Sequence, residues 1–489
     1  MTVLAVDAGT TGVTALLVDS DGAVVARGYR EFQQHFPQPG WVEHQPEQIW
    51  LATLAALEQA LTLACMNPSL VTAIGITNQR ETVAVWDRQT LEAPTPAIVW
   101  QDRRTSEILS DTKFTDAREW VREATGLPLD PYFSSSKLLW IKRNLPEVWA
   151  GVESGRYAVG TIDSYLAARI TGGKAHITDA TNASRTQLFN IHTLDWDERL
   201  LQLFEVPRSA LPSVVGNQGR LAQADASVLL GIGAPITGMA GDQHAALFGQ
   251  LAVEPGDAKC TYGTGAFLLC NTGKSPVLSD PRLIATLAWV NPDGSPTYAL
   301  EGSVFVAGAA LQWLRDGLEM VAEAADVERL AQSVSSSDGV CVVPAFAGLG
   351  APFWDAEVRG SILGITRGST KAHIARATLE SLAFQVRALT DSMAAACGGA
   401  LKRLKVDGGV TRSQLLMQLQ ADALGIPVEV PENLDTTGLG VAYLAGIGAG
   451  VWASRDELHQ TIAARFYPVK NTDAEYSRWL RAVEATRSF

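Results

Sequence analysis

Two short turns rich in glycine and threonine have the composition of phosphate-binding loops. The first is Gly9-Thr10-Thr11-Gly12 and the second, about half a chain later, is Gly263-Thr264-Gly265. Glycine lets a backbone approach an anion closely, successive N–H groups form a concave nest for phosphate oxygens, and threonine adds a hydroxyl donor. Either turn alone is typical of a plain hairpin loop. Two such turns in corresponding places indicate a pair of loops that hold one polyphosphate from both sides.

Two aspartates stand at the ends of apolar runs. Asp7 comes directly before the first turn, and Asp242 follows the run 235–240. A carboxylate at the end of a buried strand is costly unless it is paired or bound to a metal. Beside phosphates, Mg²⁺ held partly through water is the natural partner of Asp7, and Asp242 is a candidate general base. His244 is the rival base, although a histidine at the head of an apolar helix is more often structural.

A third glycine turn, Val406-Asp407-Gly408-Gly409, ends a strand and precedes a helix. The hydroxyl of Thr411 or of Ser413 can cap that helix. By itself this is an ordinary loop between a strand and a helix. Beside the other two turns, it would place a glycine face against a base or a ribose.

A charged pair and three aromatic residues lie near other strand ends. Arg80 and Glu81 follow the strand expected at 71–77, and the aromatic residues are Trp100, Tyr132 and Phe267. A single aromatic residue most often belongs to the core, and an Arg–Glu pair is usually a solvated ion pair. Collected at one cleft, these side chains would suit a small polyol, because charged groups bind hydroxyls and rings cover the carbon edge.

Composition excludes several classes of protein. The chain has 489 residues, 47% of them apolar and 19% charged, and a net charge of −13, which argues against nucleic acid as the main partner. The five cysteines form no CxxC pair and the seven histidines no HExxH motif. GxxxxGK[ST] and GxGxxG loops are absent. The N-terminus lacks the basic segment of a signal peptide and no apolar run has the length of a membrane span, so we expect a soluble, cytoplasmic protein without membrane insertion.

The strand and helix signals predict two similar α/β halves. Residues 3–30 read as a three-strand meander with a hairpin turn at Asp21-Gly22, and residues 259–270 repeat the scheme of strand, turn and strand. The further expected elements are helices at 46–65 and 373–396, the second with an apolar stripe typical of core, and strands at 71–77, 82–86 and 404–406. A boundary at Gly249–Gly256 predicts domains 1–250 and 251–489 with a ligand cleft between them.

At these residues the chain resembles the FGGY carbohydrate kinase family, and within it most closely the members that act on glycerol. The resemblance covers essentially the whole chain. The matching stretches are GWVEHQPEQIW (40–50), AIGITNQRET (73–82), AIVWQDRRT (97–105), TDATNASRTQLFNIHTLDWD (178–197), AGDQHAALFGQL (240–251), TYGTGAF (261–267), VPAFAGLGAPFWD (343–355) and TRGSTKAHIARATLESLAFQ (366–385). Both family signatures are intact, one from Tyr132 to Trp140 and the other from Gly360 to Glu380.

The resemblance implies an α/β, two-domain actin-like ATPase (ribonuclease H-like) fold with the active site in the interdomain cleft. It implies transfer of a phosphoryl group from ATP, with Mg²⁺, to glycerol, which yields sn-glycerol 3-phosphate, and a homo-oligomer, either dimer or tetramer. By similarity, the glycerol-binding residues would be Arg80, Glu81, Trp100, Tyr132, Asp242, Gln243 and Phe267. The nucleotide-binding residues would be Thr10, Thr11, Gly12, Thr264, Gly308, Gln312, Gly409 and Ser413. Asp242 would be the base, and Asp7 with Asp242 would hold the metal.

Four departures from the family pattern bear on activity. Ala8, Thr14 and Ser413 stand where relatives usually have Gln, Arg and Asn, and Gly233-Ala234-Pro235 replaces the Gly-Thr-Arg element used for fructose 1,6-bisphosphate control in some bacterial relatives. We therefore expect that control to be missing. Loss of the arginine removes a charge-assisted contact worth about 1.5–3 kcal/mol.

Two other functions stay open. One is a kinase of the same fold that acts on another small polyol or on a ketose. The other is a catalytically impaired, nucleotide- or polyol-binding regulator, for which the departures at positions 8, 14 and 413 are the motive. Retention of Asp7 and Asp242 argues against the regulator, because a sensor needs neither a metal anchor nor a base.

Overall fold

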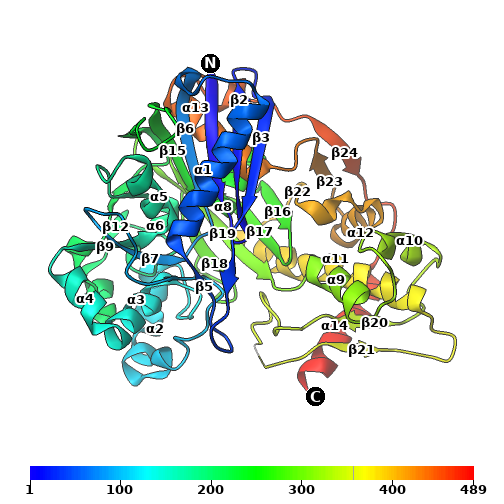
Figure 1. Cartoon of the computed structure of the whole chain (residues 1–489). Helices are drawn as coiled ribbons and strands as arrows, with labels where there is room; N and C mark the ends of the chain where they lie inside the picture. The colour runs from blue at the N-terminus through cyan, green and yellow to red at the C-terminus, as the bar shows by residue number, and fades with distance from the viewer. Residues whose placement is uncertain (356) are drawn as a thin grey trace.

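Two mixed β-sheets, one in each half of the chain, form the centre of the molecule (Figure 1). The computed structural model describes residues 1–355 and 357–489. The first sheet contains, in spatial order, β14 (Gln218–Gln223), β15 (Pro235–Gly241), β6 (Val71–Asn78), β1 (Thr2–Ala8), β2 (Gly12–Asp19) and β3 (Val24–Glu31). The second contains β18 (Ile284–Val290), β19 (Pro296–Val304), β17 (Ala266–Gly273), β16 (Ala258–Tyr262), β22 (Leu404–Asp407), β23 (Val428–Pro431) and β24 (Ile462–Phe466).

The two sheets share one topology. β1 pairs antiparallel with β2 and parallel with β6, and β6 pairs parallel with β15. In the second sheet, β16 pairs antiparallel with β17 and parallel with β22, and β22 pairs parallel with β23. An antiparallel strand follows in each case, β14 on β15 and β24 on β23. This duplicated α/β arrangement is the two-domain, actin-like fold that we predicted from the sequence.

Helices α1 (Pro46–Leu63) and α13 (Thr436–Gly448) cover the two faces of the first sheet. Successive strand residues point to opposite faces. Val13 of β2 therefore packs into the core beneath α1, and Leu16 of the same strand packs into the core beneath α13. α13 comes from the C-terminal half of the chain, and Figure 1 shows it in orange behind the blue strands. The last part of the sequence thus completes the first sheet's core.

The remaining elements surround these sheets. A five-stranded sheet beside the first one contains β4 (Gln34–His35), β5 (Glu43–His44), β8 (Ala97–Ile98), β7 (Val83–Asp87) and β9 (Tyr157–Thr161). Three strand pairs are β10 (Ile177–Asp179) with β13 (Ser213–Val215), β11 (Phe189–Asn190) with β12 (Asp195–Trp196), and β20 (Cys341–Val343) with β21 (Ser361–Leu363). The other helices are α2 (Thr112–Thr125), α3 (Ser134–Asn144), α4 (Pro146–Glu153), α5 (Ile162–Ile170), α6 (Ala180–Ala183), α7 (Glu198–Phe204), α8 (Asp242–Gly249), α9 (Gly308–Asp316), α10 (Asp326–Gln332), α11 (Lys371–Cys397), α12 (Gln414–Leu424) and α14 (Asp473–Arg487).

The strongest sequence signals are confirmed. The predicted meander forms β1, β2 and β3, and the predicted strands at 71–77, 82–86 and 404–406 form β6, β7 and β22. The helix predicted at 373–396 is α11, and its apolar stripe is buried in the core of the second half, as expected. In the described part of the chain we find no helix with the length and apolar character needed to cross a bilayer.

Candidate active site

The C-terminal ends of β1 and β15 bring Asp7 and Asp242 to one edge of the first sheet. Strand β6 lies between them, so a spacing of 4.7–4.9 Å per strand places the two strand ends about 10 Å apart. Burial, together with the neighbouring carboxylates of Asp242 and Asp435, raises the pKa of Asp7 to about 8, against the opposing effect of Arg27. The two aspartates thus lie within electrostatic reach of each other, with an excess of negative charge around Asp7.

The first glycine turn joins β1 to β2 beside Asp7. The Gly9 N–H donates to the Gly12 carbonyl at 3.0 Å, which closes the turn. Thr10 accepts a hydrogen bond at its Oγ1 from Trp100 Nε1 at 3.0 Å, and Thr11 is exposed. A Cβ atom at Gly12 would lie 2.7 Å from the Tyr29 hydroxyl, so the close approach of that ring requires glycine here.

The second turn is bonded to the start of α9. The Ala307 N–H donates to the Thr264 carbonyl at 2.8 Å, and the Gly308 N–H donates to the Gly263 carbonyl at 2.9 Å. Gln312 projects from the same helix and is exposed, as is Thr264. The structure therefore brings together three of the residues predicted to bind nucleotide: Thr264, Gly308 and Gln312.

The third turn lies next to the second, because β16 and β22 are parallel neighbours. Gly409 is exposed and has no other atom within 4 Å of the position that a Cβ would take. The Val410 side chain lies 3.1 Å from the corresponding position on Gly308, which joins this turn to α9. Ser413 Oγ accepts from the Leu416 N–H at 3.2 Å and caps α12, so the predicted cap is confirmed for Ser413.

The three aromatic residues predicted to cover a polyol lie together, with Tyr132 and Phe267 each in contact with Trp100. Its ring centroid lies 5.6 Å from that of Tyr132 and 6.2 Å from that of Phe267, with both contacts edge-to-face. Phe267 lies two residues after the second turn, and the Trp100 indole N–H is bonded to Thr10 of the first turn. Trp100 therefore connects the two glycine turns with the aromatic wall.

Lys137, in α3, holds the backbone that carries Tyr132. The lysine is fully buried, and its Nζ donates to the carbonyls of Pro131, Tyr132 and Phe133 at 2.5, 2.8 and 3.1 Å. Burial lowers its pKa to about 7. Contacts from one buried nitrogen to three successive carbonyls keep this loop in one conformation.

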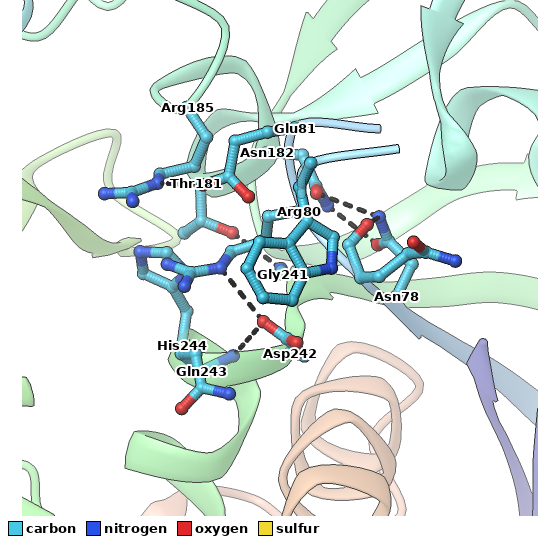
Figure 2. Close-up of polar contacts among 12 residues, drawn as sticks. Asn78, Arg80, Glu81, Thr181, Asn182, Arg185, Gly241, Asp242, Gln243 and His244 are labelled. Carbon is cyan, nitrogen blue, oxygen red and sulfur yellow. Dashed lines mark hydrogen bonds and ion pairs between the residues drawn. The ribbon is translucent and has the colours of Figure 1, made fainter. Parts of the chain in front are cut away.

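Arg80 joins the base candidate to the second half of the chain. Its Nε lies 2.9 Å from Asp242 Oδ1, and its two terminal nitrogens bind Glu301 of β19 at 2.5 and 3.1 Å. Figure 2 shows the Arg80 guanidinium and the Asp242 carboxylate pointing towards each other. Because such bidentate contacts fix the plane of a guanidinium, Glu301 determines the direction in which Arg80 presents its Nε.

Glu81 is bound by a second arginine rather than by its neighbour Arg80. Arg185 Nε lies 2.7 Å from Glu81 (Figure 2), and its Nη2 lies 3.1 Å from Glu301. All four side chains of Arg80, Glu81, Arg185 and Glu301 are at most 2% exposed, whereas Asp242 is 27% exposed. Two arginines thus balance two carboxylates, and the remaining negative charge lies on Asp242, at the open end of the network.

Sequence reasoning missed Arg185, Glu301 and a third buried group, Lys259. The Nζ of Lys259 donates to Gln243 Oε1 and, at 2.9 Å, to Thr261 Oγ1. The available signal was a charged residue inside an otherwise apolar strand, as in the segments AKCTY and TYALEGSV. Each of these charges is fully buried, and a buried charge needs a partner.

His244, the rival base, lies in a different environment from Asp242. It is 1% exposed, and its Nε2 is 3.4 Å from Thr286 Oγ1. Burial, together with the charge of Arg80, lowers its pKa well below the usual value. Its ring is therefore neutral and enclosed, as expected for a structural histidine.

Comparison with known proteins places this geometry in a family. The description "FGGY family of carbohydrate kinases, N-terminal domain" matches residues 2–249, and the C-terminal domain of the same family matches residues 258–449. Glycerol kinase from Aromatoleum aromaticum is 50% identical, with 99% of each chain covered, and glycerol kinase from Carboxydothermus hydrogenoformans is 48% identical over 100% of this chain and 98% of its own. The crystal structure of Plasmodium falciparum glycerol kinase with ADP superposes with a TM-score of 0.93 at 34% identity, covering 99% of this chain and 98% of that one.

Proposed function

The chain belongs to the FGGY family of carbohydrate kinases, and from this premise we propose that it transfers a phosphoryl group from ATP to glycerol, giving sn-glycerol 3-phosphate. Relatives that are 48–50% identical over their whole lengths carry the name glycerol kinase. The observation that supports the proposal most is the contact of 2.9 Å between Arg80 and the partly exposed Asp242, beside the rings around Trp100. A charged, donor-rich cluster of side chains beside aromatic rings suits a three-carbon polyol.

In the proposed reaction Asp242 is the general base. Its carboxylate accepts the proton of a terminal hydroxyl while that oxygen forms its bond to the γ-phosphorus and the bond from phosphorus to the ADP oxygen breaks. Arg80, Glu81, Tyr132 and Gln243 would bind the hydroxyls. Trp100 and Phe267 would pack on the carbon chain and exclude water, which favours transfer to glycerol over hydrolysis.

The nucleotide would lie against the three glycine turns. Thr10, Thr11, Gly12 and Thr264 would donate to phosphate oxygens, and Gly308, Gln312, Gly409 and Ser413 would line the adenosine site. Gly308 and Gly409 support this assignment because both lie at the junction of the second turn, the third turn and α9. We accordingly propose domains 1–250 and 251–489, with α13 as the segment of the second that packs on the first sheet.

A magnesium ion would be held by Asp7 and Asp242. The fit is supported by the half-buried Asp7, because burial and the nearby carboxylates raise its pKa to about 8 and a bound cation would offset both effects. Among residues 1–355 and 357–489 no group of three or more His, Cys, Asp or Glu side chains could hold a metal. A site with one or two carboxylates is what Mg²⁺ uses when phosphate and water complete its shell. When bound, the ion would supply charge neutralisation for the phosphates.

Glycerol-dependent release of ADP from MgATP by the purified protein tests the proposal. A substrate panel with erythritol and a ketopentose at equal concentration separates glycerol from the other substrates of this fold. A much higher kcat/KM for one of those substrates would refute the assignment to glycerol. No ADP release with any acceptor at saturating MgATP would support the regulator instead. Light scattering on the same sample tests the homo-oligomer that we propose, and fractionation of the source cells tests a cytoplasmic location.

A further inference from the structure

The phosphate turn of the first sheet carries no cation of its own. Residues 8–15 read Ala-Gly-Thr-Thr-Gly-Val-Thr-Ala. Phosphoryl transfer from a triphosphate depends on neutralising the charge that spreads over its terminal oxygens. Asp7 and Asp242 already bring two carboxylates to this edge of the sheet. Any side-chain cation that assists a bound Mg²⁺ in this neutralisation therefore has to come from another element.

Arg27 of β3 faces this edge of the sheet. Asp7 pairs with Thr14 across β1 and β2, and Thr14 pairs with Tyr29 across β2 and β3. Since residues two apart on a strand share a face, Arg27 lies on the same face as Asp7, Thr14 and Tyr29. Arg27 pairs with Leu16 in the register of β3 with β2, two positions along from the pair of Thr14 with Tyr29.

The Arg27 guanidinium is positioned but still accessible. Its Cζ lies 5.4 Å from the centroid of the Tyr29 ring, and its Nε lies 3.0 Å from Asp435 Oδ2. The two side chains of this ion pair are 45% and 38% exposed. Within residues 1–355 and 357–489, the hydrogen bonds of Arg27's side chain involve Nε alone, so both terminal nitrogens are open to an incoming group.

We infer that Arg27 binds the terminal phosphates of the nucleoside triphosphate, and that Asp435 competes with the nucleotide for this side chain. The inference rests on the proposed ATP-dependent activity. The planar guanidinium suits two phosphate oxygens at once, and the Tyr29 ring supports it from below. Asp435 also weakens nucleotide binding in a second way, because its carboxylate repels the phosphates directly.

Binding of MgATP, MgADP and AMP to variants tests this assignment by calorimetry. Arg27→Met should weaken MgATP binding about ten- to a hundredfold, which is the loss of one charge-assisted contact, and should weaken AMP binding by less than twofold. Asp435→Asn should act in the opposite direction and tighten MgATP binding about two- to fivefold. Asp435 makes no side-chain capping bond to α13, so the asparagine variant leaves the helix start intact.

Two further variants control for structure. Arg30 lies on the same strand but on the α1 face, and Arg30→Met should leave MgATP affinity within twofold. Arg27→Lys retains the charge but not the bidentate geometry, so its MgATP affinity should lie between those of the wild type and Arg27→Met, which separates the phosphate contact from a folding defect. Thr14→Arg in the Arg27→Met background should restore affinity at least partly, because position 14 lies between Asp7 and Tyr29 in the register.

An Arg27→Met protein with unchanged MgATP affinity would overturn the inference. So would equal weakening by Arg27→Met and Asp435→Asn, because a purely structural ion pair loses the same contact from either side. A wild-type protein that binds no MgATP would overturn it as well. If Arg27→Met weakens MgATP binding but glycerol stimulates no ADP release, the substrate assignment fails and the phosphate assignment stands.

Discussion

The two central sheets have the same strand pairing, yet they end in different chemistry. At the edge of the first sheet stand Asp7 and Asp242, both at least partly open to solvent. At the equivalent edge of the second, β16 ends in the buried Tyr262, and β22 ends in Asp407, whose Oδ2 accepts bonds from Gln250 at 2.8 Å and Thr436 at 2.7 Å. Asp407 is thus buried and bonded to two structural side chains, whereas Asp7 and Asp242 each keep part of their surface open to solvent.

This contrast separates the role of the fold from that of the residues. The parallel strands bring loops to one edge in both halves, which is a property of the topology. The first edge carries charged side chains, and the second carries exposed glycine backbone. This difference suits the two halves to different substrates. We expect the first sheet to perform the proton and phosphoryl chemistry and the second to hold the nucleotide by shape.

The largest difference between the two edges should appear when one aspartate at each edge is replaced by asparagine. Asp242→Asn should lower kcat about 10²- to 10⁴-fold, because a general base contributes that much, while glycerol binding stays measurable. Asp407→Asn should cost stability, by about 1–3 kcal/mol, and change kcat by only a few-fold. Steady-state kinetics and equilibrium unfolding measure both. Near-normal turnover in Asp242→Asn would exclude Asp242 as the base.

Glu301 of the second sheet binds the arginines at the charged edge of the first sheet. Its replacement should have the next largest effect, a loss of unfolding free energy. Glu301→Gln leaves Arg80 and Arg185 buried without their shared carboxylate, which should cost about 3–5 kcal/mol of unfolding free energy. Glu429 of β23 is a matched control, because its partner Arg465, 3.1 Å away, is half exposed. Glu429→Gln should cost about 1 kcal/mol or less in the same denaturant titration. Equal losses of unfolding free energy in the two variants would show that the buried ion pairs stabilise the protein no more than the exposed pair does.

The same residue gives a pH dependence with a defined sign. Burial alone would raise the pKa of Glu301, but Arg185 and Arg80 lower it to about 2 in the folded state, below its ordinary value of 4.5. A folded pKa below the unfolded one contributes stability above pH 4.5, here about 3 kcal/mol, and this contribution is lost as the pH falls towards 2. The stability difference between wild type and Glu301→Gln should therefore shrink to about half between pH 7 and pH 3. A constant difference would contradict this.

Local signals explain which parts of this architecture could be predicted. The β1–β3 meander has apolar strands bounded by clear turns, and helix α11 has an apolar stripe at helical spacing, so their positions follow from the chain itself. Helix α13 reads Thr-Thr-Gly-Leu-Gly-Val-Ala-Tyr-Leu-Ala-Gly-Ile-Gly and is buried nearly all round, so it has no amphipathic stripe to reveal it. Its place on the first sheet depends on contacts that no local pattern encodes.

The candidate site divides in the same way. The glycine turns and the aspartates at strand ends could be predicted because each is a short motif next to a strand. The ion-pair network could not, because Arg80 and Glu301 are 221 positions apart in the sequence and Arg185 and Glu301 are 116 apart. Only the folded arrangement of the two halves brings these charges together.

Two adjacent glycines in the third turn, Gly408 and Gly409, should have different roles at the second edge. Gly408 has a φ of +92°, and a Cβ there would lie 2.3 Å from the Tyr262 carbonyl oxygen. Gly408→Ala therefore combines left-handed strain with a clash against the backbone and should cost about 2–4 kcal/mol in unfolding free energy. Thermal unfolding of the nucleotide-free protein measures it. An alanine variant as stable as the wild type would mean that the turn relaxes without cost.

Gly409 should show the opposite pattern and gives the smallest expected effect. A Cβ at this position meets no atom within 4 Å, so Gly409→Ala should change stability by less than about 0.5 kcal/mol. Its methyl group would project from the exposed glycine face on which we place the adenosine, and MgATP affinity should fall about five- to tenfold, with AMP affinity falling equally. That equal loss separates it from Arg27→Met, whose effect requires the terminal phosphates. If Gly409→Ala leaves both affinities unchanged, the third turn does not contact the nucleotide. The assignment of nucleotide binding to this edge of the second sheet would then be wrong.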